Sequence, residues 1–196
     1  GESTGGRLRS TDPPITVPAW TSMFSSVNPG GLGFFGFRNL RKGTYDGKWI
    51  ATAEAIKVER AWDIASRYGK RCCVLGVPQT YPPKPLNGCL VSSFLTPSTE
   101  SDYTYPPELK EEVEKVTGGY VLDVEEFRTE DKERLLADIY EMTDKHFALA
   151  RHMLSREDWD LFIYVEMGPD RIQHGFWKFV DPEHRKYQPG NRYENC

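Results

Sequence analysis

The chain has 196 residues, 38% of them hydrophobic, which is enough for one domain with a sizeable buried core. Its net charge of −4 and the lack of a long basic run argue against a surface for nucleic acid polymers. No apolar run approaches the about 18 residues of a membrane span, so no span is expected.

The first predicted elements surround a threonine between prolines, in the stretch PPITVPAWTS that begins at Pro13. Residues 7–11 alternate as in a β-strand, and a helix is expected over about 17–27. Thr16 suits the N-cap of this helix, and Pro18 lies in the first turn, where proline is tolerated. The same place on a helix also suits a nucleophilic hydroxyl, so the local pattern leaves both interpretations open.

Turn residues at 28–31 are expected to end that helix and to lead into the stretch GGLGFFGF. Its glycines match GxGxxG, but a dinucleotide site needs a strand before the motif and a helix after it. Here a helix precedes the motif and the polar loop RNLRKGTYDGKW follows, so that interpretation is rejected. Residues 52–68 then show a helical period and residues 71–77 resemble a buried strand, which together form an α/β unit.

Adjacent Cys72 and Cys73 lie in this predicted strand and should point to opposite faces of the sheet. Together with Cys89 and Cys196 they show no CxxC spacing, which argues against a zinc knuckle. Buried, reduced thiols are the simpler interpretation, and they favour a reducing compartment such as the cytoplasm.

The middle of the chain is rich in proline. Residues 78–107 are expected to be irregular, and the wider range 78–128 is a possible lid or cap insertion within a single domain over 1–196. A short charged helix is expected at 107–117 and a strand at 120–124.

The last third of the chain is expected to contain the longest helix, over 129–155, with acidic residues at its N-terminus. The stretch DLFIYVE at 160–166 is almost wholly apolar, so we expect a strand that is buried on both faces of a parallel sheet. Helices that alternate with buried strands predict an α/β fold with a mostly parallel sheet flanked by helices.

Asp170 and His174 follow this strand in the loop segment MGPDRIQH. Open α/β sheets place their chemistry at the carboxyl ends of strands, and a helical turn would put both side chains on one face. A carboxylate and an imidazole suit Zn²⁺, and also Mn²⁺ or Fe²⁺, whereas the alternative is a capping aspartate beside a surface histidine. Glu166 at the strand end would support a ligand indirectly. Solvated or core positions are expected for the other histidines, His146, His152 and His184.

Taken together, PPITVPAWTSMFSSVNPGGLGF and VEMGPDRIQH resemble the alkaline phosphatase superfamily, and most closely its type I phosphodiesterase/nucleotide pyrophosphatase branch. Thr16 matches the family's nucleophile, which also binds one metal, and Asp170 and His174 match two ligands of the other metal. The resemblance implies an alkaline phosphatase-like fold and a hydrolase of small phosphorylated substrates with two divalent metals, Zn²⁺ before Mn²⁺ or Fe²⁺. Attack by the threonine alkoxide on phosphorus would form a covalent phospho-enzyme, which water hydrolyses.

Some positions depart from the family pattern. Ser25-Ser26 stands where a Thr-Gly pair is common, Leu32 where a His is common, and Ala19 where nucleotide pyrophosphatases have an Asn, which argues against a nucleotide substrate. The family's remaining metal ligands, an earlier Asp, an Asp-His pair and a final His, have no match. We therefore expect a fold that is incomplete at both ends, completed by missing parts of a parent chain, and no hydrolysis by this chain alone.

Other functions fit the same residues. A phosphomutase or a phosphonate hydrolase of the superfamily would share the fold, whereas a sulfatase is disfavoured because it usually uses a modified Cys or Ser as nucleophile. A non-catalytic module that keeps the fold and binds a phosphorylated or glycan ligand would fit the departures at Ala19 and Leu32.

Overall fold

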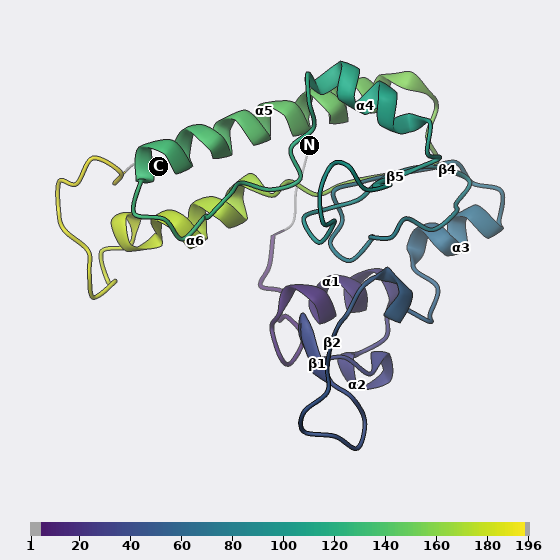
Figure 1. Cartoon of the computed structure of the whole chain (residues 1–196), viewed down its shortest axis with the longest axis horizontal. Helices are drawn as coiled ribbons and strands as arrows, with labels where there is room; N and C mark the ends of the chain where they lie inside the picture. The colour runs from purple at the N-terminus through teal and green to yellow at the C-terminus, as the bar shows by residue number, and fades with distance from the viewer. Residues whose placement is uncertain (1–4, 195–196) are drawn as a thin grey trace.

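The computed structural model describes residues 5–194, which are arranged around a four-stranded sheet of order β5-β4-β3-β6 (Figure 1). β3 runs parallel to both β4 and β6, and β5 runs antiparallel to β4. The predicted α/β fold with a mostly parallel sheet is therefore confirmed. The strands of this sheet are β3 (Cys72–Leu75), β4 (Gly88–Val91), β5 (Thr104–Tyr105) and β6 (Leu161–Tyr164).

Helices pack on both faces of the sheet, because side chains of a strand alternate between its faces. Cys73 belongs to the buried cluster that includes Val113 of α4 and Leu149 of α5, whereas Cys72 belongs to the cluster of Trp62 of α3. The two adjacent cysteines thus face opposite layers, as predicted. The helices are α1 (Thr16–Ser25), α2 (Pro29–Leu32), α3 (Ala61–Arg67), α4 (Leu109–Thr117), α5 (Lys132–Arg156) and α6 (Gly168–Val180).

A small group of N-terminal elements has a core of its own. α1 and α2 lie with the hairpin β1 (Arg38–Leu40) and β2 (Lys48–Ile50) away from α4 and α5 in Figure 1. α1 also reaches the central layers, because Phe24 packs on Trp62 and the Thr21 hydroxyl donates a hydrogen bond to Gln79. The buried apolar residues that form this core, here called the N-terminal cluster, are Val17, Phe34, Ala51 and Ile56.

The N-terminal elements differ from the sequence prediction. Residues 7–11 form no strand, and α1 ends at Ser25 because Ser26 adopts the left-handed region with φ 60°. The turn predicted at 28–31 mostly forms α2 instead. Asn28 caps this short helix, since its side-chain oxygen accepts a hydrogen bond of 2.9 Å from the Gly31 N–H.

Two more predicted elements need correction. The helix predicted at 52–68 is split into a 3₁₀ turn, η1 (Ala53–Ala55), and α3, because Asp63 accepts a 2.9 Å hydrogen bond from the Arg60 N–H and so starts a new helix. The strand predicted at 120–124 is wrong, since those residues are irregular and the Val121 carbonyl pairs with a His146 ring nitrogen. The helices predicted at 107–117 and 129–155 correspond to α4 and α5.

The stretch 78–107, predicted to be irregular, contains the central strand β4 and the edge strand β5. Gly88 opens β4 with φ 137°, and a Cβ atom at this position would clash with the Cys72 carbonyl oxygen. The close approach of β3 and β4 therefore requires glycine here. The wider range 78–128 contributes β4, β5 and α4, and its action as a lid stays a prediction.

β6 is less buried than the prediction for 160–166. All four of its residues are half-buried. Within the described part of the chain β6 pairs with β3 alone, so the sheet covers only one of its edges.

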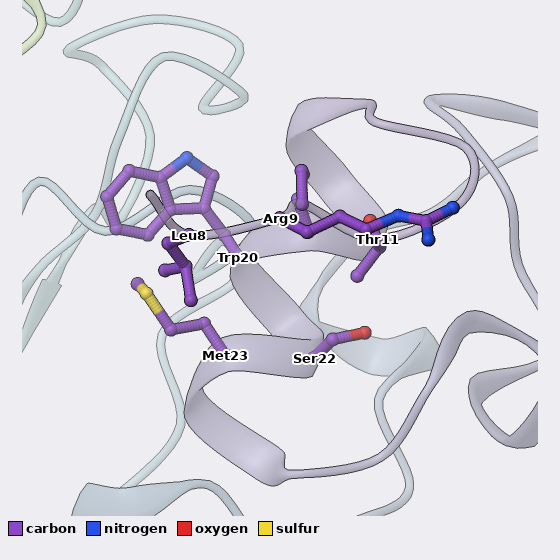
Figure 2. A pocket seen from close by; sticks show the side chains of 8 residues that line it. Leu8, Arg9, Thr11, Trp20, Ser22 and Met23 are labelled. Carbon is purple, nitrogen blue, oxygen red and sulfur yellow. The ribbon is translucent and has the colours of Figure 1, made fainter. Parts of the chain in front are cut away.

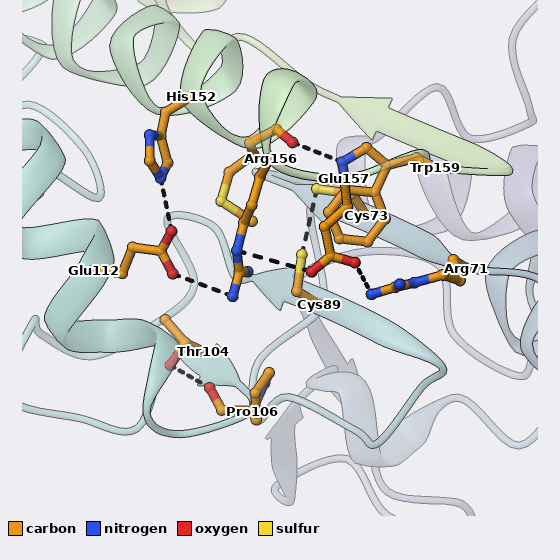
Figure 3. A network of polar contacts seen from close by, with 11 residues as sticks. Arg71, Cys73, Cys89, Thr104, Pro106, Glu112, His152, Arg156, Glu157 and Trp159 are labelled. Atoms are coloured by element: carbon orange, nitrogen blue, oxygen red, sulfur yellow. Dashed lines mark hydrogen bonds and ion pairs between the residues drawn. The ribbon is translucent and has the colours of Figure 1, made fainter.

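A buried thiol pair and a polar network lie where the sheet meets α4 and α5 (Figure 3). The Sγ atoms of Cys73 and Cys89 are 3.4 Å apart across β3 and β4, and Cys72, Cys73 and Cys89 are free thiols, whereas Cys196 lies outside the described residues. Arg156, the last residue of α5, pairs with Glu112 of α4 at 3.3 Å.

None of the helices within residues 5–194 combines the length and apolar character that crossing a membrane requires.

Candidate active site

A cavity of about 350 Å³ is lined by residues that follow β3, β4 and β6 and by residues of α1 and α6. Pro78 follows β3, Phe94 follows β4, and Glu166 follows β6. The carboxyl ends of neighbouring parallel strands are the usual place for a binding site in such sheets. Of the residues predicted from sequence, this one cavity brings together Thr16, Asp170 and His174.

Thr16 enters the cavity from the start of α1, but it does not cap the helix. The N-cap is Ile15, which is extended with φ −114° and ψ 142° and makes no side-chain cap hydrogen bond. Thr16 is instead the first helical residue and is half-buried. The predicted capping role is therefore wrong, and the hydroxyl is left at the wall of the cavity.

α6 owes its position to two glycines on one of its faces. A Cβ atom at Gly168 would clash with the Thr143 hydroxyl of α5, and one at Gly175 would lie 2.8 Å from a methyl group of Leu135, also in α5. At about 100° per residue, positions 168 and 175 share a face, and Asp170 lies roughly opposite. The close packing of α6 on α5 thus turns the opposite face of α6 toward the cavity.

Asp170 and His174 lie one turn apart on that face, on α6 rather than in the loop that was predicted. His174 Nε2 is 3.7 Å from Asp170 Oδ2, and the two side chains are 51% and 46% exposed. The predicted sharing of one helix face is confirmed. In a tetrahedral zinc site with bonds of about 2.0–2.1 Å, neighbouring ligand atoms lie about 3.4 Å apart, so this pair fits two corners of one site.

The pair supplies only part of a coordination sphere. Within residues 5–194, no three His, Cys, Asp or Glu side chains are grouped so as to hold a metal ion. Asp170 Oδ2 also accepts a 2.5 Å hydrogen bond from Arg171 Nη1, so a cation bound there would compete with this guanidinium. The donor types fit zinc, manganese or iron, and further ligands would be needed to complete the site.

Arg171 and Asp123 form an ion pair that the sequence analysis missed. The guanidinium binds Asp123 through two hydrogen bonds of 2.6 and 2.5 Å, and it lies 4.6 Å from the centre of the Phe127 ring. Burial lowers the pKa of Arg171, but the ion pairs with Asp123 and Asp170 outweigh it, so the pKa lies above its ordinary value. Arg171 is adjacent to Asp170 in the motif, whereas the sequence around Asp123 carries no signal.

Glu166 holds the start of α6 in place. Its carboxylate accepts hydrogen bonds from the Gly168 N–H at 2.8 Å, from the Thr143 hydroxyl at 3.2 Å and from the Tyr164 hydroxyl. Burial raises the pKa of Glu166, but hydrogen bonds from His146, Tyr164 and the Gly168 N–H hold the net pKa below its ordinary value. The ionised carboxylate is therefore the form that the fold stabilises.

The variant Glu166→Gln should show what this carboxylate contributes as the pH changes. Because its folded pKa is depressed, its contribution is fully present above the unfolded pKa of about 4.3 and is lost as the pH falls through the folded pKa. The difference in free energy of unfolding between wild type and variant should be largest at neutral pH and shrink below about pH 4.3. Urea unfolding across this range measures it, with the exposed Glu125→Gln as control; a difference independent of pH would contradict the assignment.

The other histidines lie outside this cavity, in the core and solvated positions that were predicted. His146 is buried and contacts the Val121 carbonyl at 2.7 Å and Glu166 at 3.5 Å. His152 pairs with Glu112 at 2.7 Å on the surface, and His184 accepts a hydrogen bond from the Lys186 N–H.

Trp20 separates the cavity from a second, more apolar one. The second cavity, of about 410 Å³, is lined by Trp20, Leu8 and Met23, whose side chains come together in Figure 2. Ala19 also lines this second cavity and not the one with Thr16. The indole of Trp20 therefore forms a wall shared by both.

The sequence of the chain matches a known family. The family model of type I phosphodiesterases and nucleotide pyrophosphatases matches residues 1–188, a range that includes Thr16, Asp170 and His174. Comparison with curated proteins and with solved structures gives no match. Since the family model covers nearly the whole chain, the chain belongs to the type I phosphodiesterase/nucleotide pyrophosphatase family, a branch of the alkaline phosphatase superfamily.

Proposed function

We propose that this chain is part of a metal-dependent phosphodiesterase or related phosphoryl hydrolase that acts on a small phosphorylated substrate through Thr16. The family supports phosphoryl hydrolysis in general. The observation that carries the specific proposal is that Thr16 from the start of the chain and Asp170 and His174 from its last third line one cavity. A hydroxyl beside a carboxylate–imidazole pair is the chemistry that such a reaction needs.

In the proposed reaction Thr16 Oγ attacks phosphorus as the bond to the leaving oxygen breaks. The threonine proton passes through water to the leaving oxygen, which departs as an alcohol, and the phosphoryl group is held on Thr16. A water molecule then attacks phosphorus, the bond to Thr16 Oγ breaks, and a proton of that water restores the hydroxyl. Bound divalent metals would lower the pKa of the hydroxyl and stabilise charge on the phosphoryl oxygens.

Two features of the chain would orient the phosphoryl group. The first turn of α1 offers the N–H groups of Thr16 and Val17, because Pro18 has none and the Ala19 N–H donates to Ile15. Arg128 lines the cavity as an exposed guanidinium suited to phosphoryl oxygens. Arg171 holds Asp170 toward the cavity rather than binding substrate, because Asp123 and Asp170 already occupy it.

Two divalent metals, zinc or else manganese or iron, fit this proposal, with Asp170 and His174 on one and Thr16 on the other. A catalytic zinc ion takes three protein ligands, and the pair on α6 supplies two. We therefore expect the isolated chain to bind metal weakly and to hydrolyse substrates slowly or not at all until further segments of the parent protein complete the site. The free thiols support a reducing compartment such as the cytoplasm.

Titration of the chain with Zn²⁺ and Mn²⁺ by calorimetry tests the metal pair. Weak binding is expected, and both His174→Ala and Asp170→Asn should abolish it. His152→Ala is the matched control, because His152 also contacts a carboxylate, Glu112, on the surface. Metal binding that is lost with His152→Ala and kept with His174→Ala would contradict the proposal.

One observation favours a second candidate, a non-catalytic module that binds a phosphorylated ligand. The Asp170 carboxylate is already paired with Arg171 at 2.5 Å, which neutralises a metal ligand. A phosphomutase or phosphonate hydrolase would use the same residues as the proposed hydrolase. Turnover of bis-p-nitrophenyl phosphate by the full-length natural protein separates the hydrolase from the module, and a phosphonate ester tests the related activity.

A further inference from the structure

A basic cavity adjoins the candidate active site on the far side of His174. It has a volume of about 290 Å³ and lies between the segment before α5, the middle of α6 and the polar tail after α6. Its lining includes five arginine and lysine side chains, Arg128, Lys132, Lys178, Arg185 and Lys186.

The positive charge of this cavity is largely uncompensated. Among the described residues that line it, the only carboxylate is that of Glu130, which is 86% exposed and pairs with Lys178 at 3.3 Å. The whole chain carries a net charge of −4, so this concentration of cations is specific to one place. A cavity with five cations and one carboxylate attracts an anion with several charges.

Lys132 adds a buried, hydrogen-bonded ammonium group to the exposed cations of the cavity. It is a buried lysine, and its ammonium donates a 2.5 Å hydrogen bond to the Thr129 carbonyl while lying 5.9 Å from the centre of the Phe176 ring. Burial lowers its pKa, the neighbouring Lys178 acts in the same direction, and Glu130 opposes them. An anion bound in the cavity would stabilise this buried ammonium.

The basic cavity is continuous with the candidate active site, because Arg128 and His174 line both. A ligand held near Thr16 and His174 can therefore extend past His174 toward Lys178 and Arg185. This continuity favours one substrate that spans both cavities over an unrelated anion.

We propose that the basic cavity binds a second phosphate group of the substrate, so that the substrate is a phosphodiester carrying a further phosphate away from the scissile bond. The statement that the bound phosphate belongs to a substrate rests on the proposed function. The phosphate site itself stands on the five cations and can be tested without turnover.

The binding test uses sodium tripolyphosphate as the probe and calorimetry as the measurement. The double variant Arg185→Glu/Lys186→Glu should weaken binding by at least about tenfold, since it reverses two of the five charges. Both side chains are exposed, which limits any effect on folding. The matched control is Arg38→Glu/Lys48→Glu, which changes the net charge equally at exposed positions of the β1–β2 hairpin and should leave binding nearly unchanged.

The catalytic test uses the full-length natural protein and two phosphodiesters, one with a second phosphate and one without. The double variant should lower kcat/KM about tenfold for the first and leave the second unchanged. Tripolyphosphate binding that both double variants weaken equally, or equal loss for both substrates, overturns the proposal. If neither substrate is hydrolysed but tripolyphosphate binding still depends on Arg185 and Lys186, the phosphate site stands and the proposed hydrolase fails.

Discussion

Thr16→Ala should abolish phosphodiester hydrolysis by the full-length natural protein, with a loss in kcat of at least about a thousandfold. The free energy of unfolding should change by less than about 1 kcal/mol, because Ile15 is the N-cap of α1 and Thr16 does not cap it. Loss of turnover without loss of stability separates a role of Thr16 in the reaction from a structural role. The steady-state rate and the urea unfolding curve of the same variant measure both.

The chain offers a matched control one turn and a residue further along α1. The hydroxyl of Thr21 is buried, and its single proton is shared between two acceptors, the Gln79 side-chain oxygen and the Val17 carbonyl. Thr21→Ala should therefore cost about 1–3 kcal/mol of stability and leave the chemical step intact. Thr16→Ser should retain measurable turnover, because it keeps the hydroxyl. Full activity of Thr16→Ala would exclude Thr16 as the nucleophile.

Arg171→Met should destabilise the fold by about 3–5 kcal/mol, because it leaves the carboxylate of Asp123 without its partner in a largely buried place. The Arg171 side chain is 7% exposed and that of Asp123 is 24% exposed. The guanidinium also contacts Phe127 and Phe94 and so joins α6 to two loops around the cavity. Equilibrium unfolding in urea measures the change.

Two further variants separate the buried pair from a general effect of removing an arginine. Arg192→Met removes a surface pair with Glu133, whose side chains are 65% and 69% exposed, and should cost less than about 1 kcal/mol. Arg171→Met combined with Asp123→Leu should recover part of the lost stability, because no unpaired charge remains. Equal effects of Arg171→Met and Arg192→Met would show that the Asp123 pair has no special weight.

The fold was predictable where the local pattern was strong. The run CCVL is wholly buried in β3, and the periodic stretch around 129–155 is α5. β4 could not be predicted, because it is four residues long and lies among prolines, and because what makes it a strand is its pairing with β3. The alternation at 7–11 predicted a strand that does not form, because no strand among the described residues pairs with it.

The candidate site was predictable only in part, for a related reason. Asp170 and His174 are four residues apart, so in a helix they share one face. Their proximity could therefore be predicted from the sequence. The pairing of Arg171 with Asp123 joins residues from distant parts of the chain, and neither segment indicates the other. The basic cavity is hidden in the same way, because its cations come from three separate segments.

The separate core of the N-terminal elements affects how the site comes apart. Thr16 lies on α1 beside the N-terminal cluster, whereas α6 packs in another buried cluster through Phe176. Parts of a protein with few buried contacts open locally at a lower free energy than its global unfolding. A local opening of the N-terminal cluster would move the Thr16 hydroxyl away from Asp170 and His174 while the strands of the central sheet stay paired. Mild denaturation would therefore separate the residues of the candidate site before the whole fold is lost.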